Sequence, residues 1–485
     1  MRTRGDIVLV SCYELGHQPF HLASLMATLQ AAGYTPVPVD TAVDTLSDEI
    51  IQRARFIGIS VPMHTALRLG EQIAQRIRQV NPAAHICFYG LYALLNAEHL
   101  LQHTIDSAIG GEYETPLLNL IRTVEAGHAT SIPGVYTREA QSGPWIQRTP
   151  FLVPERRELP EPERYARLER AGSQHVAGYT ETTRGCKHTC AHCPITPVYQ
   201  GRFFAVPRDI VMADIRAQVA RGARHITFGD PDFWNGPTHA MRIVRMLHQE
   251  FPDVTFDATI KIEHLLKHQH LLPEMKEAGC MFIVSALESL NDTVLQHLQK
   301  GHSAHEAMEA MHLVEATGIS LRPSLLPFTP WETLDSYIRL LDFFEENHFI
   351  EHLDPVHLSI RLLIPPGSAV LHDPDCRHWL GPLDPASFSY RWQHPDPRMD
   401  VLQRNAVQCA EEAECGCTDP IRTFFQVKAL ALRLRGEDFS IDQAMQHYGK
   451  SKTVPHLTES WFCCAEPFQS QAGREKALTP PCCQG

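Results

Sequence analysis

The chain has no long apolar run and no excess of positive charge. No stretch of its 485 residues approaches about eighteen consecutive apolar positions, so we expect no membrane-spanning helix. Its net charge of −13 argues against a general nucleic-acid binder, because phosphate binding depends on clustered Lys and Arg. The opening residues, 1–6, lack the apolar stretch of a signal peptide, and we expect a soluble, cytoplasmic protein. In that compartment fourteen cysteines indicate metal or redox chemistry and not a disulfide framework.

Three of these cysteines, Cys186, Cys190 and Cys193, fall within eight residues. A four-iron cluster closed by protein needs four thiolates, so three from one loop leave one iron open to an outside ligand, which is typical of a reaction centre. Two alternatives remain open: a zinc site completed by His188 or His192, and a closed structural cluster with a distant fourth cysteine. Zinc is less favoured, because structural zinc sites usually divide their ligands into two separated pairs.

The spacing of this loop resembles the signature of radical S-adenosylmethionine (SAM) enzymes. The resemblance implies a [4Fe-4S] cluster on the three cysteines, whose open iron chelates SAM. It also implies one-electron cleavage of SAM to methionine and a 5′-deoxyadenosyl radical. Residues 171–370 alternate strand and helix patterns and predict a partial (β/α)6 barrel, with the cysteine loop directly after its first strand. The predicted strands are His175–Thr180, His225–Phe228, Val254–Ala258, Met281–Ser285, Ile319–Pro323 and His357–Ile364.

Residues 1–130 alternate short β-rich runs with amphipathic stretches. They predict an α/β, doubly wound, flavodoxin-like domain, whose ligand lies beyond the carboxyl ends of its parallel strands. This arrangement resembles the cobalamin-binding domain of B12-dependent radical SAM enzymes. A doubly wound domain with a vestigial or different ligand site is the alternative. The predicted strands are Asp6–Ser11, Thr35–Val39, Phe56–Val61, His85–Tyr89 and Asp106–Ile109.

The second resemblance also implies which residues hold cobalamin. Gly90 and the turn Gly110-Gly111-Glu112 are expected to line the groove for its nucleotide tail. The chain lacks the Asp-x-His-x-x-Gly signature that supplies a cobalt ligand. His17 and His64 lie on candidate loops, and each is either an axial ligand or a polar lining residue.

Two further segments complete the predicted organisation. Residues 131–170 are turn-rich and charged and predict a linker between the domains. Residues 371–485 predict a small, mostly helical region with a cysteine-rich tail, including a helix near Ile421–Leu434.

Polar residues at the ends of the predicted barrel strands are candidates for binding SAM. Gly229 and Asp230 stand where family members carry a Gly-Gly-Glu-Pro element that contacts the amino group of SAM. A helix N-cap is the alternative for Asp230. Ser285 and Glu288 resemble a segment placed against the ribose and carboxylate of SAM.

Two arginines are candidates for holding a carboxylate. Arg322 and Arg361 are expected at the barrel mouth, where an arginine clamps the carboxylate of SAM or substrate in bidentate fashion. A structural ion pair is the alternative for each of them.

The C-terminal tail holds close cysteine pairs. They are open to three interpretations: an auxiliary metal site, a redox-active thiol pair, or unreactive thiols. The segment Trp461-Phe-Cys-Cys-Ala-Glu-Pro467 resembles the hallmark of the Cys-Cys-Ala-Glu-Pro-tail radical SAM subgroup. Because some members carry selenocysteine at the second cysteine, the resemblance implies a nucleophilic or metal-binding role for Cys464.

The functional hypothesis is a cobalamin-dependent radical SAM methyltransferase acting on an unactivated carbon. We expect a small-molecule or peptide substrate and a flavodoxin- or ferredoxin-type electron donor. One alternative is a cobalamin-dependent rearrangement or cyclisation without net methyl transfer. The other is a non-catalytic iron–sulfur and corrinoid redox protein.

Overall fold

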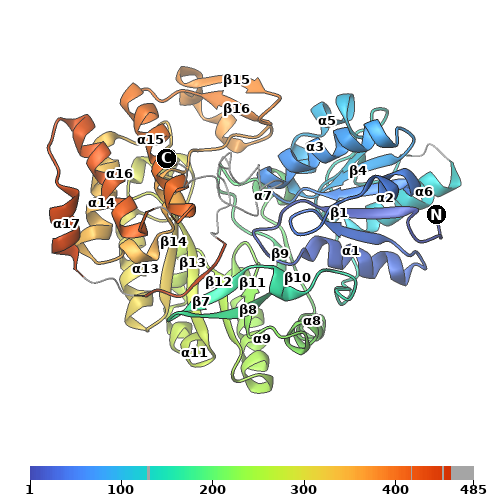
Figure 1. The fold of residues 1–485 in the computed structure, drawn as a ribbon, viewed down its shortest axis with the longest axis horizontal. Helices are drawn as coiled ribbons and strands as arrows, with labels where there is room; N and C mark the ends of the chain where they lie inside the picture. Colours follow the sequence, from blue (N-terminus) through green and yellow to red (C-terminus); the bar gives the residue numbers. More distant parts are fainter. Residues whose placement is uncertain (128–130, 417, 450–452, 460–485) are drawn as a thin grey trace.

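The computed structural model describes residues 1–127, 131–416, 418–449 and 453–459. Its described residues form two large sheets covered by helices, two small two-stranded sheets (β9–β10 and β15–β16), and a mostly helical C-terminal region beside the second large sheet (Figure 1). No helix within the described residues is long and apolar enough to span a bilayer.

The first sheet has the strand order β2-β1-β3-β4-β5-β6, with the first five strands parallel and β6 antiparallel to β5. Side chains alternate across it: Ile7 and Leu9 pack on the face covered by α1 and α6, while Val8 and Val10 pack on the face covered by α2, α3 and α5. Both faces are therefore buried, as in doubly wound sheets. The elements are β1 Ile7–Ser11, α1 Phe20–Ala31, β2 Val37–Asp40, α2 Asp48–Arg53, β3 Phe56–Ser60, α3 His64–Val80, β4 His85–Tyr89, α4 Leu91–Leu95, α5 Ala97–His103, β5 Ser107–Ile109, α6 Glu114–Ala126 and β6 Val135–Tyr136.

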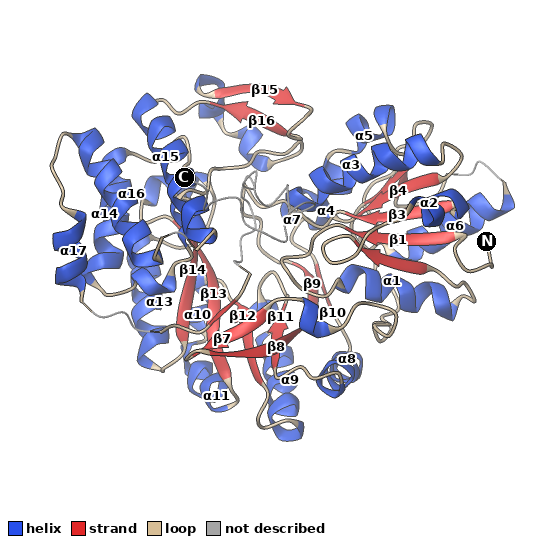
Figure 2. Ribbon diagram, viewed as in Figure 1, coloured by secondary structure: helices blue, strands red, loops and turns tan. Residues whose placement is uncertain are grey.

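The second sheet is open, with the order β14-β13-β12-β11-β8-β7-β17. Strands β8 and β11 to β14 are parallel, and helices cover their outer face (Figure 2). The elements are β7 Arg167–Arg170, β8 Ser173–Thr180, β9 Thr183–Gly185, α7 Ile195–Tyr199, β10 Phe203–Ala205, α8 Arg208–Ala220, β11 His225–Phe228, α9 Pro237–Glu250, β12 Thr255–Thr259, α10 Ile262–Lys267, α11 Leu272–Glu277, β13 Cys280–Glu288, α12 Asp292–His297, α13 Ala304–Ala316, β14 Ser320–Leu325 and α14 Leu334–Glu346.

The predicted sixth barrel strand, His357–Ile364, is wrong. Its first residues form the 3-10 helix Pro355–Leu358, and the remainder meets the sheet only through an isolated bridge between Phe328 and Arg361. The facing segment contributes to this, because Pro330 lacks the backbone N–H group that would continue the ladder two residues after Phe328.

The segment 131–170, predicted as a linker, contributes to both sheets through β6 and β7. It also contains a buried charge: Arg156 is 3% exposed and donates to both carboxylate oxygens of Asp214, at 2.6 and 3.0 Å. The connection between the two sheets is therefore anchored in the interior of the protein.

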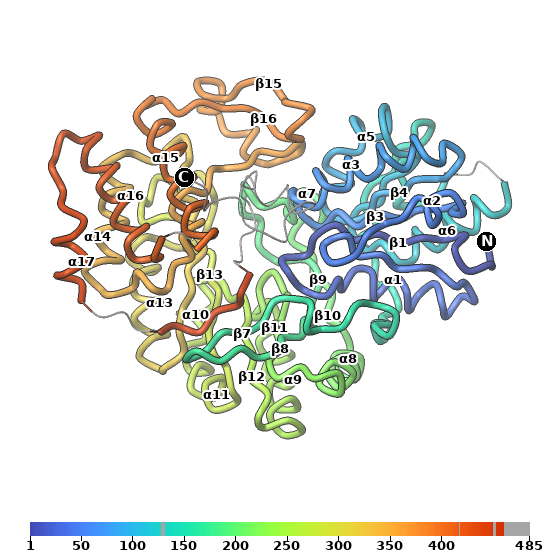
Figure 3. Tube along the Cα trace, viewed as in Figure 1, coloured from blue at the N-terminus to red at the C-terminus, as the bar shows by residue number. Residues whose placement is uncertain are grey.

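The C-terminal region packs against both domains. Helices α15 (Pro397–Glu414) and α16 (Pro420–Arg435) join the core of the second sheet, and α17 (Ile441–Tyr448) packs against α16. The hairpin β15 (Leu380–Asp384) and β16 (Ser389–Trp392) reaches the first domain, where Phe388 enters its core. The last described strand, β17 (His456–Leu457), runs beside β7, nearly 290 residues earlier in the chain (Figure 3).

Candidate functional site

One cavity lies between the two sheets, at the carboxyl ends of both sets of parallel strands. Ligand sites in doubly wound sheets and in barrels occur at this edge, where the chain leaves each strand. The first domain contributes Glu14, Leu15, His17, His21, Pro62, Met63, Gly90, Leu91, Tyr92, Gly111 and Tyr113 to the lining, and the second contributes the cysteine loop and the ends of β8 and β11 to β14.

Cys186, Cys190 and Cys193 all line this cavity. Their loop is held at its middle: Ala191 donates its backbone N–H to the carbonyl of Leu298 at 2.9 Å, and the hydroxyl of Thr196 donates to the carbonyl of Cys190 at 2.9 Å. Burial raises the pKa of the Cys186 thiol to about 11, so this thiol is protonated until a metal displaces the proton. Three thiols facing one space from one anchored loop are a donor set that fits an iron–sulfur cluster.

Arg184, two residues before the first cysteine, links the cysteine loop to the first domain. It is buried, and its guanidinium donates to Glu114 at 2.6 Å, to Glu181 at 3.0 Å and to Glu112 at 3.3 Å. Glu112 also accepts from the hydroxyl of Tyr199 in α7, at 2.8 Å. Glu112 and Glu114, the two acids of the turn that begins at Gly110, thus both hold the base of the cysteine loop.

The residues predicted to bind cobalamin divide into two groups. Gly90, Gly111 and His17 line the cavity, whereas Gly110, Glu112 and His64 do not. A Cβ at Gly110 would lie 2.6 Å from a side-chain atom of Leu94, so this glycine allows close packing.

The two histidines of that prediction differ in environment. His17 packs against Tyr179 in a tilted arrangement with ring centroids 4.6 Å apart, and burial lowers its pKa to about 4, so its imidazole is neutral. The Nε2 of His64 lies 2.6 Å from the carbonyl oxygen of Ser387 and connects α3 to the β15–β16 hairpin.

Gly229 and Asp230 line the cavity at the end of β11. Asp230 is 1% exposed and accepts from the backbone N–H of Thr182 at 2.9 Å and from the hydroxyls of Thr182 and Thr183 at 2.7 and 2.6 Å. Burial raises the pKa of Asp230 to about 6. Both of its oxygens are therefore already bonded to the strand that leads into the cysteine loop.

At the end of β13, Glu288 faces the cavity and Ser285 does not. Glu288 lies 3.1 Å from the Nε2 of His192 and accepts from the Nζ of Lys300 at 3.0 Å. Although burial opposes ionisation, these two partners hold its pKa well below the usual range. Ser285 is fully buried and donates to the carbonyl of Ile260 at 2.6 Å.

Of the two arginines predicted at the barrel mouth, only one lines the cavity. Arg322 lines the cavity and pairs there with Asp354. Arg361 lies outside the cavity lining, where it donates to Asp400 at 2.7 Å and to the carbonyl of Trp392 at 2.7 Å and stacks over the Trp392 ring.

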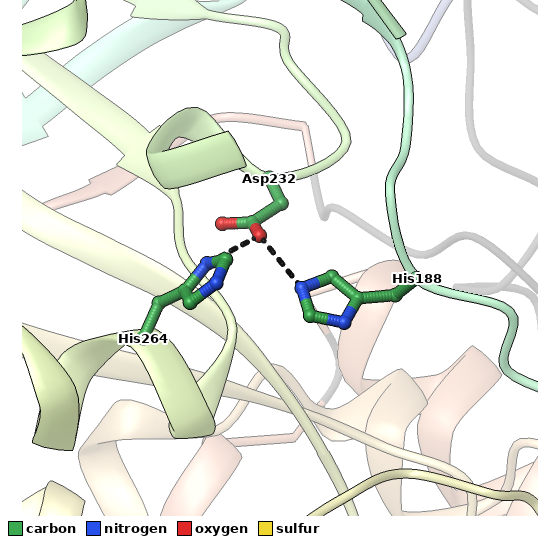
Figure 4. Close-up of side chains that lie close together, drawn as sticks. All are labelled: His188, Asp232 and His264. Carbon is green, nitrogen blue, oxygen red and sulfur yellow. Dashed lines mark ion pairs between the residues drawn. The ribbon is translucent and has the colours of Figure 1, made fainter. Parts of the chain in front are cut away.

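A cluster of His188, Asp232 and His264 stands beside the cysteine loop (Figure 4). Burial alone would raise the pKa of Asp232, but the two neighbouring imidazoles lower it far below its usual range. His188 and Asp232 line the cavity, and His264 lies behind them on α10.

The predicted tail residue Cys464 lies outside the described residues, as do Cys417, Cys463, Cys482 and Cys483. Among the described cysteines of this region, Cys376 is buried and Cys409 and Cys415 are partly buried. None of these three lines the cavity.

Sequence reasoning missed Arg184, Lys300, Asp232 and His264. The adjacency of Arg184 to the first cysteine was a usable signal, since a charged residue at the base of a metal loop needs a partner. No comparable signal exists for His264, because only the packing of α10 brings it to the cysteine loop.

The part of the chain that contains the cysteine loop is similar to known proteins. Residues 180–344, which contain the cysteine loop and strands β9 to β14, match the model of the radical SAM superfamily. The chain is 25% identical over 179 residues to the ribosomal protein uS12 methylthiotransferase RimO of Chloroherpeton thalassium, covering 35% of this chain and 41% of that protein. It thus spans about two fifths of the length of the curated relatives that it first matches.

Two solved structures share the fold over most of the chain. One is the cobalamin-dependent radical SAM enzyme OxsB with aqua-cobalamin bound (TM-score 0.65, 16% identity, 88% of this chain and 72% of that chain). The other is the radical SAM methyltransferase TsrM from Kitasatospora setae, with cobalamin and a [4Fe-4S] cluster bound (TM-score 0.63, 16% identity, 91% of this chain and 99% of that chain). At this identity the likeness establishes the shared fold.

Proposed function

We propose that the protein is a cobalamin-dependent radical SAM enzyme that methylates an unactivated carbon of a small-molecule or peptide substrate. The observation that carries the proposal is one cavity between the sheets, lined on one side by three thiols of one loop and on the other by the carboxyl ends of the first sheet. The similarity to OxsB, solved with aqua-cobalamin, and to TsrM, solved with cobalamin and a [4Fe-4S] cluster, supports the choice of cofactors.

In this proposal Cys186, Cys190 and Cys193 hold the [4Fe-4S] cluster, and cobalamin occupies the side of the cavity lined by His17, Gly90 and Gly111. When bound, these groups and SAM together supply one-electron cleavage of SAM and a transferable methyl group. The protein positions them through the interdomain contacts of its cysteine loop and excludes water from the space between the sheets.

The other predicted residues that line the cavity have distinct proposed roles. Glu288, held ionised by His192 and Lys300, is suited to accept a hydrogen bond from SAM. Arg322 is suited to bind a carboxylate, of SAM or of the substrate, in exchange for Asp354. We place Gly229 at the SAM side of the wall and assign Asp230 to positioning, because its oxygens already bind Thr182 and Thr183.

Three of the predicted site residues are assigned no direct contact with a cofactor or substrate. Ser285, Arg361 and His64 lie outside the cavity lining, and we assign them to the framework around it. A reactive thiol at Cys464 stays a prediction, as does membership of the Cys-Cys-Ala-Glu-Pro-tail subgroup.

The proposed chemistry also sets requirements on the cell. It needs a one-electron donor of the flavodoxin or ferredoxin type and a reducing compartment, which we take to be the cytoplasm.

The test is anaerobic purification with cobalamin, followed by iron, sulfide and corrin analysis and a SAM-cleavage assay. We expect about four irons per chain, bound corrin, and 5′-deoxyadenosine on reduction. The variant with Cys186, Cys190 and Cys193 replaced by Ala should lose the cluster and SAM cleavage, whereas Cys376→Ala should retain both. Full iron in the triple variant, or a loaded and reduced protein that leaves SAM intact, contradicts the proposal.

Product mass then decides the reaction type. A gain of one methylene unit in the product supports methyl transfer, while substrate consumption without that gain indicates rearrangement or cyclisation.

A further inference from the structure

Three side chains from separate parts of the second domain converge at one wall of the cavity. His188 belongs to the cysteine loop, Asp232 to the segment after β11, and His264 to α10 (Figure 4). The Nδ1 of His264 lies 2.6 Å from the Oδ2 of Asp232, and the Nε2 of His188 lies 3.4 Å from the same oxygen. All three atoms lie within 4.8 Å of one another.

These three atoms are buried without hydrogen bonds. His264 and Asp232 are each 1% exposed, and the side chain of His188 is 14% exposed. Within the described part of the chain, none of the three atoms has a partner in hydrogen-bonding geometry, despite the short separations. Because buried polar atoms are almost always satisfied, a missing partner is indicated at the point where they meet.

The rest of the cluster is arranged to hold these atoms in place. The other oxygen of Asp232 accepts from the backbone N–H of Trp234 at 3.2 Å and of Lys261 at 3.4 Å, which leaves Oδ2 to face the histidines. The Nδ1 of His188 lies 3.8 Å from a carboxylate oxygen of Glu263, the kind of outer partner that orients an imidazole whose other nitrogen binds a metal.

We propose that His188, Asp232 and His264 form a site for a divalent transition metal, separate from the iron–sulfur cluster. Two imidazoles and one carboxylate are a donor set used for zinc and for ferrous iron, and three protein ligands leave a coordination position open. Ligands about 2.1 Å from a tetrahedral ion stand about 3.4 Å apart, so the His188 contact of 3.4 Å already fits, and the His264 contact of 2.6 Å must lengthen by about 0.8 Å.

The open position determines what the ion would do. His188 and Asp232 line the cavity, so the vacant side of the ion faces the space proposed for SAM and substrate. The site would bind an oxygen or nitrogen of the substrate and orient it toward the cysteine loop. This role rests on the proposed function, whereas metal binding itself is tested independently of it, because zinc and cluster iron are counted separately.

One neighbour competes with the metal. The Nζ of Lys261 lies 3.2 Å from the Nδ1 of His188, and that nitrogen must carry a proton when Nε2 binds a metal. Lys261 must then turn toward Glu263, which lies 3.5 Å away. Lys261→Gln should therefore bind zinc more tightly than the unmodified protein.

The test uses the full chain with its cluster reconstituted, incubated with zinc chloride and desalted, with zinc and iron measured by mass spectrometry. We expect His264→Gln to retain one zinc per chain fewer than the unmodified protein, with iron unchanged. His268→Gln is the matched control, because this partly exposed histidine follows on the same segment with its ring 5.9 Å from that of His264. It should retain the full amount of zinc.

Two further measurements keep the result decisive. If His264→Gln does not fold, Asp232→Asn, which has the same size and keeps an oxygen for Trp234, replaces it with the same expectation. Cobalt substitution should give ligand-field bands that disappear in either variant. Equal zinc in the unmodified protein and in a folded His264→Gln or Asp232→Asn variant overturns the proposal. A second, more exposed cluster contains His297, Asp373 and Asp375. Zinc loss in Asp373→Asn alone would assign the zinc to that cluster and also overturns the proposal. The three residues would then form only an ion-pair cluster.

Discussion

Replacing Arg184 by Ala tests whether the cysteine loop is held by a buried ion network. The side chain of Arg184 is 7% exposed and faces Glu112, Glu114 and Glu181, so its removal leaves buried carboxylates without a counter-ion. Breaking a buried pair in this way costs about 3–5 kcal/mol. Burial already raises the pKa of Glu112 and of Glu181, and proton uptake by these two acids limits the loss, so we expect about 3 kcal/mol near neutral pH.

The assay is urea unfolding followed by circular dichroism, with iron retention after reconstitution as a second measurement. The matched control is Arg216→Ala, because Arg216 makes a two-bond pair with Glu250 (2.6 and 2.7 Å) on the surface. An exposed pair contributes about 1 kcal/mol or less. We expect Arg184→Ala to lose both stability and iron, and Arg216→Ala to lose neither to a comparable degree. Equal losses in the two variants refute the argument from burial.

Two further predictions concern the cavity wall. Gly229→Ala should lower the free energy of unfolding by about 1–3 kcal/mol, because its Cβ would lie 1.9 Å from the hydroxyl oxygen of Tyr179. Tyr179→Ala should relieve the clash in the double variant, and additive losses by urea unfolding would show that the two residues do not collide. Burial raises the pKa of Glu181 from an ordinary value of 4.5 to about 7, so the folded protein binds more protons than the unfolded chain in that range and loses stability as the pH rises through it. Glu181→Gln should flatten this decline in urea midpoints between pH 4.5 and 7, and an unchanged slope would contradict the assignment.

Sequence patterns were sufficient where local hydrophobic periodicity and tertiary packing agree. Strands β4 and β11 begin and end at the residues predicted, because each is a short segment in an inner strand position whose residues are nearly all buried. The same reasoning failed at His357–Ile364, where the apolar alternation is present but Pro330 in the facing segment lacks the donor needed to continue a ladder. Strand patterning describes a segment's own side chains and says nothing of the donors offered by its neighbour.

The candidate site shows the same division. By itself the sequence determined the three-cysteine loop and its place after the first barrel strand, since close spacing alone brings these thiols together. Only the tertiary structure decided that Glu112 and Glu114 bind Arg184, that Asp230 is occupied by Thr182 and Thr183, and that His264 meets the loop. These contacts join residues 47 to 76 positions apart, and tertiary packing selects their partners, which leaves no local signal in the chain.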